Sequence, residues 1–74
     1  ISFEIPAKSR ARLAVYDVRG MRVRVLMDED VPAGRRDVTW DGRDDRGIAV
    51  ASGVYFCELT AGKQSVRRKM MLLQ

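Results

Sequence analysis

Residues 10–27, RARLAVYDVRGMRVRVLM, alternate apolar with polar side chains almost without interruption. A period of two is typical of a strand that turns one face to a core and the other to solvent. Between the two runs, Arg19-Gly20 supplies a tight turn, because glycine readily adopts a positive φ. The stretch therefore predicts an antiparallel hairpin. The side chains expected to face inward are Ala11, Leu13 and Val15 in the first strand and Met21, Val23 and Val25 in the second.

The rest of the chain repeats this pattern in short runs about ten residues apart, and no segment has a helical period. Besides the hairpin, the expected strands are residues 1–5 (ended by Pro6), a run ending at 38–40, a short run at 48–50, residues 53–60 and residues 64–74. Six or seven short strands at this spacing predict an antiparallel β-sandwich or a small barrel. Because 74 residues suffice for only one core, residues 1–74 are expected to form a single all-β domain.

The composition argues against several classes of function. The net charge is +4, but the basic residues are dispersed among apolar and acidic ones, which is typical of solvated strand faces rather than of nucleic-acid binding. No run approaches the roughly 18 apolar residues that a membrane span needs. The single cysteine, Cys57, has no disulfide partner, and no histidine is present to activate Cys57 or a serine as a nucleophile. We expect a non-enzymatic protein with no cofactor and no membrane insertion, in which Cys57 is a buried apolar side chain.

The stretch WDGRDDRG at residues 40–47 is the richest in polar chemistry. Its carboxylates could gather oxygen ligands for calcium, although the spacing differs from that of helix-loop-helix calcium loops. Alternatively, Asp41 and Asp44 accept hydrogen bonds from backbone amides and fix two turns, while Gly42 and Gly47 take positive φ. The weak metal candidates are Asp41, Asp44 and Asp45.

The two largest aromatic side chains of the second half have two possible roles. Trp40 could be a stacking platform for a sugar, but a lone tryptophan beside a thin sandwich is more often part of the core. Tyr55 stands two residues before Cys57, a spacing also found on one strand of immunoglobulin domains, and we expect its hydroxyl to be tied to the backbone. The residues expected to hold the two sheets together are Trp40, Tyr55, Leu13, Val15, Val23 and Leu72.

Arg67, Arg68 and Lys69 form the one compact basic run, and Met70 follows it. Edge strands often carry positive charge, which prevents unwanted pairing between sheets, so a solvated edge strand would explain the run. The alternative is a recognition signal that a partner protein reads. The sequence leaves both interpretations open.

Several segments taken together resemble one known family. The segments are LAVYDVRGMRVRVL at 13–26, PAGRRDVTWDGRDDRGIAVASGVYFCEL at 32–59 and RRKMMLLQ at 67–74. They resemble the immunoglobulin-like domain of the flagellar hook-capping protein and are similar to the C-terminal sorting domain of proteins exported by the type IX secretion system. The resemblance implies a small immunoglobulin-like β-sandwich without a disulfide. Its structural signature would be Trp40, Asp41, Gly42, Gly47, Gly53 and Tyr55, and its partner-recognition residues Arg67, Arg68, Lys69 and Met70.

In function, the resemblance implies a C-terminal sorting or anchoring module of a longer bacterial protein that is secreted or displayed on the cell surface. The partner would be a protein of the secretion or assembly machinery. The alternative is a structural subunit or spacer of an extracellular assembly, in which edge strands pair with another chain or with copies of the same chain by strand addition. A weaker alternative, a carbohydrate- or calcium-binding accessory module, rests only on Trp40 and the 41–47 loop.

Overall fold

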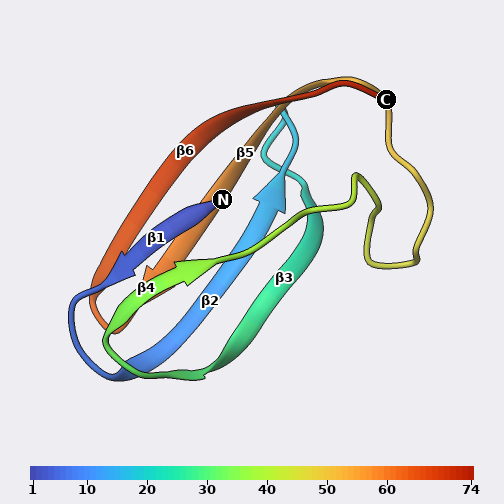
Figure 1. Cartoon of the computed structure of the whole chain (residues 1–74). Coiled ribbons are helices and arrows are strands. Elements are labelled where there is room, and N and C mark those ends of the chain that lie inside the picture. The colour runs from blue at the N-terminus through green and yellow to red at the C-terminus, as the bar shows by residue number, and fades with distance from the viewer.

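The computed structural model describes all of residues 1–74 as six strands in two antiparallel sheets (Figure 1). The strands are β1 (Ser2–Ile5), β2 (Ser9–Tyr16), β3 (Arg22–Val31), β4 (Gly34–Asp37), β5 (Gly53–Ala61) and β6 (Gln64–Leu72). One sheet has four strands in the order β3-β2-β5-β6, and the other contains only β1 and β4. The predicted all-β sandwich is confirmed. The short strand expected at 48–50 is reduced to one isolated bridge between Arg43 and Ala49.

Two tight turns join the hairpins of the larger sheet. Between β2 and β3, Asp17 Oδ1 accepts hydrogen bonds from the amides of Arg19 and Met21, and Gly20 has a φ of 82°. Between β5 and β6 the connection is Gly62 and Lys63 alone. Local turn chemistry of this kind sets the register of a hairpin, so the predicted hairpin at 10–27 forms as expected.

The expectation for the inward face of β3 was wrong. Two β-bulges interrupt its pairing with β2, so that Leu13 lies opposite Met27 while the next residue, Ala14, lies opposite Val25. A bulge adds one residue to one strand and moves the following side chains to the other face. Val25 therefore shares the outer face with Ala14, and Met21 is 63% exposed. Met27 and Val31 take the inner positions instead.

The core lies between the inner faces of the two sheets. From the smaller sheet, β1 contributes Phe3 and Ile5, which are 4% and 2% exposed. The members of the cluster are Phe3, Ile5, Ala11, Leu13, Met27, Val31, Cys57, Leu59 and Ala61. Six of the nine are Val, Leu, Ile, Phe or Met, and burying one such side chain contributes about 1.5–3 kcal/mol to folding.

The predicted set of core residues is only partly correct. Leu13, Val15 and Tyr55 are buried, whereas Trp40, Val23 and Leu72 are only half-buried. Val23 lies outside the core because the second bulge lies beside it. Leu72 faces inward, but it lies at the end of the sheet and is only half covered there. Sequence reasoning missed the β1 side chains as the main contribution of the smaller sheet.

The strand expected to end at 38–40 ends earlier. β4 stops at Asp37, although Val38 still exchanges two backbone hydrogen bonds of 2.8 Å with Ile1. Beyond Val38 the chain leaves the sheet, and the Trp40 indole donates to the Arg43 carbonyl at 2.9 Å. This departure begins the long loop that connects the two sheets at one end of the molecule (Figure 1).

Arginine side chains close the sandwich along its two open sides. On one side the Arg68 guanidinium of β6 lies 4.5 Å from the centre of the Phe3 ring and donates to the Ser2 carbonyl of β1 at 2.6 Å. On the other side Arg36 of β4 pairs with Glu29 of β3. The smaller sheet is thus tied to both edges of the larger one.

Candidate interaction site

The 41–47 loop is built from two turns that aspartates fix. Asp41 Oδ1 accepts a hydrogen bond from the Arg43 amide at 3.1 Å, and Asp44 Oδ1 accepts from the amides of Arg46 and Ile48 at 2.9 and 3.0 Å. Hydrogen bonds to the charged form lower the pKa of the Asp44 carboxyl, with the Ile48 amide as the largest cause. The positive φ values expected for Gly42 and Gly47 are confirmed at 75° and 81°. The turn-forming interpretation of this loop is therefore confirmed.

Asp45 has a different role that the sequence did not reveal. Its backbone amide donates to the Val23 carbonyl at 3.0 Å, and its Oδ1 accepts from the Val25 amide at 2.9 Å. Both groups belong to the outer edge of β3, which has no neighbouring strand. Asp45 therefore occupies the edge of β3 at Val23 and Val25 in place of a strand. A shorter length of β3 is then left free to pair with another strand.

The three aspartates are not brought together as metal ligands. Asp41 faces Arg24, Asp44 faces the turn amides, and Asp45 faces β3. No group of three or more His, Cys, Asp or Glu side chains in the structure is placed to hold a metal ion. The arrangement gives the calcium hypothesis no geometric support.

Two long side chains brace the loop from outside. Arg24 Nη1 of β3 donates to Asp41 Oδ1 at 3.2 Å and to the carbonyls of Arg43 and Asp44 at 3.2 and 3.4 Å. Gln74 Nε2 donates to the carbonyls of Gly42 and Val50 at 2.9 and 3.0 Å. Gly42 is buried beneath this amide, and a Cβ there would lie 2.7 Å from Gln74 Nε2.

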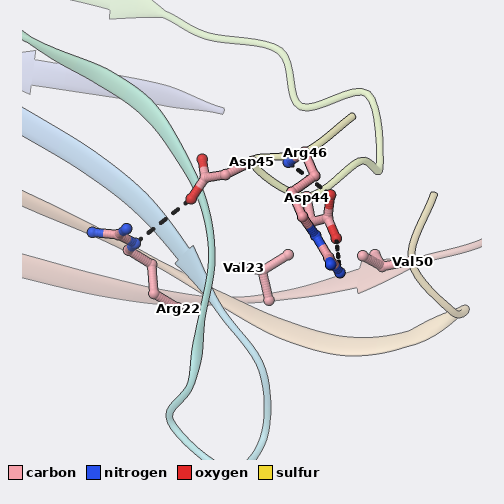
Figure 2. A pocket seen from close by; sticks show the side chains of 6 residues that line it. All are labelled: Arg22, Val23, Asp44, Asp45, Arg46 and Val50. Atoms are coloured by element: carbon pink, nitrogen blue, oxygen red, sulfur yellow. Dashed lines mark hydrogen bonds and ion pairs between the residues drawn. The ribbon is translucent and has the colours of Figure 1, made fainter. Parts of the chain in front are cut away.

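A shallow pocket of about 300 Å³ lies where the loop meets β3 (Figure 2). Figure 2 shows that its polar side chains approach one another in pairs: Arg22 Nε lies 3.6 Å from Asp45 Oδ2, and Arg46 Nη2 lies 3.4 Å from Asp44 Oδ2. Val23 and Val50 supply its apolar wall. Each cation already faces an anion, so the pocket presents little unbalanced charge to a ligand.

Trp40 and Tyr55 pack together at the base of the loop. Their rings meet edge to face, with centroids 5.1 Å apart and an interplanar angle of 70°. The Tyr55 hydroxyl donates to the Ala51 carbonyl at 2.6 Å, which confirms the expected link between this hydroxyl and the backbone. Trp40 thus supports the loop from inside, and the structure favours a packing role over a sugar platform.

β6 is an edge strand, and its basic run divides between two faces. Arg67 and Lys69 point outward, because they pair with Glu58 and Phe56 on the outer face of β5. Arg68 and Met70 lie on the inner side, where Met70 packs against the core and Arg68 contacts β1.

The outward cations differ in their contacts. Arg67 lies 3.5 Å from Glu58 and 5.7 Å from the centre of the Phe56 ring. Lys69 has no acidic side chain within salt-bridge distance. The free edge of β6 therefore carries one paired and one unpaired outward cation.

Cys57 lies at the centre of the core and is fully buried. Burial raises the pKa of its thiol above the usual 9.0, since the surrounding apolar groups disfavour the thiolate. This confirms its interpretation as a small apolar side chain.

Sequence reasoning missed Arg24, Arg36 and Asp45 as structural residues. Each contacts a different element of the structure, and the 16 residues between Arg24 and Asp41 carry no periodic signal for the contact. The alternation of charge in β3 is compatible with an ordinary solvated face, which is how it was interpreted.

Comparisons with known proteins agree with this architecture. A model of the family described as "FlgD Ig-like domain" matches residues 1–65, a span that includes the nine-residue core cluster, the 41–47 loop and the β2–β3 hairpin but only the start of β6. No match was found among curated proteins, and none was found among solved structures. The comparisons support the hook-capping part of the resemblance and give no match for the type IX sorting domain. No helix in the structure is both long and apolar enough for a transmembrane span. Since the match covers well over half of the residues, the chain belongs to the FlgD Ig-like domain family.

Proposed function

We propose that the chain is a non-catalytic structural module of an assembly on the bacterial cell surface, and that it joins the assembly through a strand edge. The observation that carries this proposal is the free edge of β6, nine residues long and without a neighbouring strand. Its pairing with β5 runs in one continuous register with no bulge that would twist it away from a partner. Membership of the FlgD Ig-like domain family supports an assembly role.

The surface of β6 also fits a protein partner. Arginine and methionine are enriched at protein interfaces, and β6 presents Arg67 beside the partly buried Phe56, with Lys69 and Met71 next to it. An extended segment of a partner could pair with the backbone of β6 while its side chains meet these residues. Such a partner would carry carboxylates opposite the cations.

The second candidate is a C-terminal sorting module of a longer secreted protein, with Arg67, Arg68, Lys69 and Met70 as the recognition residues. The exposure of Arg67 and Lys69 on the last strand favours it. Removing the whole segment from residue 66 onward would not test it cleanly, because β6 supplies one complete edge of the four-stranded sheet and Met70 packs against the core. Point substitutions that leave the sandwich intact are needed.

The experiment replaces Arg67→Gln and Lys69→Gln together in the parent protein within its source bacterium. A matched control, Lys8→Gln with Arg19→Gln, removes the same charge from exposed positions away from β6. Two quantities are measured: the amount of parent protein exported, and the fraction of exported protein held in the cell-surface assembly.

A structural role predicts normal export and reduced incorporation for the β6 variant alone. Reduced export would favour the sorting role instead. If both quantities match those of the control variant, the β6 edge has neither role and the proposal is wrong.

A further inference from the structure

The two edges of the four-stranded sheet carry opposite charge. Figure 1 shows β3 and β6 at opposite sides of this sheet. β6 carries Arg67, Arg68 and Lys69 in succession, and β3 carries Asp28, Glu29 and Asp30 in succession. Both runs are exposed at edges without neighbouring strands.

We infer that β6 of one copy pairs with β3 of a second copy, so that the four-stranded sheets of successive copies join into one continuous sheet. This inference rests on the proposed function and names the partner of the β6 edge as another copy of the same chain. The pairing is head-to-tail, because the two edges that meet are different surfaces of the molecule.

The strand directions allow this pairing. β3 and β5 are both antiparallel to β2, and β6 is antiparallel to β5. β6 therefore runs opposite to β3. A second copy placed beside the first in the same orientation brings its β3 antiparallel to β6, as the rest of the sheet already is.

One register matches the side chains on both faces. If Arg68 lies opposite Glu29 of the second copy, then Arg67 lies opposite Asp30 and Lys69 opposite Asp28. Arg67, Lys69, Asp28 and Asp30 all belong to outer faces, since their partners within the sheet are the outward residues of β5 and β2. Arg68 and Glu29 both belong to inner faces, opposite Cys57 and Ala11.

The apolar residues that flank the charges also match in this register. Val66 would lie opposite Val31, and Met70 opposite Met27. All four are inward residues, and Val66 is 43% exposed although it faces the core side. A neighbouring strand would cover it. A shift by one residue would place inward against outward side chains, so the register is specific.

The alternatives between identical edges are unfavourable. Two copies of β6 paired about Arg68 would bring three cations against three cations, and two copies of β3 paired about Glu29 would do the same with carboxylates. Like charges directly opposite in a sheet are destabilising. The charge pattern thus selects β6 against β3 over either symmetric dimer.

The remainder of the structure leaves the required edge accessible. Asp45 covers β3 only at Val23 and Val25, and both bulges precede Met27. Three of the charged residues already form ion pairs at the surface, Asp28 with Arg10, Glu29 with Arg36 and Arg67 with Glu58, while Arg68 contacts Ser2 and Phe3 of β1. The three ion pairs can exchange partners without burying an unpaired charge, because all of their members are partly exposed.

The test uses the chain of residues 1–74 and two charge-reversed variants. The first, Arg67→Glu with Lys69→Glu, makes β6 acidic. The second, Asp28→Lys with Asp30→Lys, makes the β3 edge basic. The weight-average mass is measured by sedimentation over a range of concentrations in low salt and in about 500 mM salt, and circular dichroism confirms that each variant is folded.

The unmodified chain is expected to form concentration-dependent oligomers in low salt, with association at least about tenfold weaker at high salt because ions screen exposed charges. Each variant alone should be monomeric, since its two edges then carry the same sign. An equimolar mixture should associate again, because the acidic β6 of one variant meets the basic β3 of the other, and the original pairing holds in the other direction. A monomeric unmodified chain, or association that neither reversal weakens, would overturn the inference.

A second measurement does not depend on charge-reversed variants that could fail to fold. Lys69→Cys and Asp28→Cys are placed in separate chains that also carry Cys57→Ala, and the mixture is oxidised. Directly opposed strand positions are within reach of a disulfide. Mass spectrometry should find the 69–28 link more than about tenfold more often than the link from Lys69→Cys to Asp30→Cys, which is out of register. Equal yields of the two links would contradict the register.

Failure here is distinguishable from failure of the proposed function. If the chain stays monomeric in solution but incorporation of the parent protein still depends on Arg67 and Lys69, the partner of β6 is a different protein and only the self-pairing is wrong. If the chain associates through these edges but incorporation is unaffected by the β6 variant, the self-pairing stands and the assembly role is wrong.

Discussion

Tyr55 shows how one side chain can link a core to a loop. The residue is 8% exposed, its ring packs on Trp40, and its hydroxyl donates to the Ala51 carbonyl at 2.6 Å. Tyr55→Phe should lower the free energy of unfolding by about 1–2 kcal/mol, because it leaves that carbonyl without its donor. Urea denaturation followed by tryptophan fluorescence measures the change. The control is Tyr16→Phe, whose hydroxyl makes no hydrogen bond within the protein and whose loss should have a smaller effect.

The Asp44 carboxylate is expected to make the stability of the chain depend on pH in the acid range. Its pKa is lowered in the folded chain by hydrogen bonds from the Ile48 and Arg46 amides. At a pH between the folded and the unfolded pKa of Asp44, the unfolded chain therefore binds more protons than the folded chain. The Asp44 carboxylate stabilises the fold fully above the usual pKa of 3.8, and this stabilisation is lost as the pH falls through the pKa of the folded chain.

Thermal unfolding from about pH 5 to about pH 2.5 tests this prediction. The unmodified chain should lose more stability across the range than Asp44→Asn, which has no proton to bind there. Asp30→Asn is the control, because the Asp30 carboxylate accepts no hydrogen bond within the chain. An Asp44→Asn chain with an unchanged acid profile would contradict the assigned cause.

At the scale of the element, β1 depends on an arginine from the other sheet. Arg68 of β6 covers the Phe3 ring and donates to the Ser2 carbonyl. Arg68→Ala should cost about 1 kcal/mol of stability, as expected for an exposed cation–π contact with one hydrogen bond. Hydrogen exchange should show faster exchange of the β1 amides while the β5 amides keep their protection. Lys69→Ala, next along the strand but without a contact to β1, should leave both unchanged.

The elements were predictable where local chemistry determines them and less so where remote contacts do. Alternation and turn residues predicted the hairpin at 10–27 and the two strands at 53–60 and 64–74, and the pairing of Asp41 and Asp44 with nearby amides required only a few residues of sequence. The bulges in β3 were not predictable from the sequence. They lie beside Arg24 and Val25, which contact the remote 41–47 loop through Arg43 and Asp45. The contact of Arg68 with Ser2 spans 66 residues, and alternation alone carries no information about it.

For the whole molecule, Cys57 offers a probe of global unfolding. Its side chain is fully buried at the centre of the core, and burial raises the pKa of its thiol, so the native chain presents almost no reactive thiolate. A thiol reagent should therefore label it only after the two sheets separate. Labelling measured against urea concentration should follow the same transition as Trp40 fluorescence. Labelling well below that transition would mean that the β5 region opens independently.

The two hydrogen bonds between Asp45 and β3 affect the shape of any array that the chain would form. With Val23 and Val25 occupied, only residues 26–31 of β3 remain open, so a neighbouring strand must meet the lower end of β3 rather than its full length. Within one sheet, Asp28 of β3 lies level with Ser65 of β6, through the paired residues Arg12 and Thr60 of the two strands between them. Lys69, the proposed partner of Asp28 in the next copy, lies four residues farther along β6. Each added copy would accordingly be stepped along the strand axis by about 13 Å, at about 3.3 Å for each residue. Combined with the natural twist of sheets, this stagger would wind a growing array into a spiral.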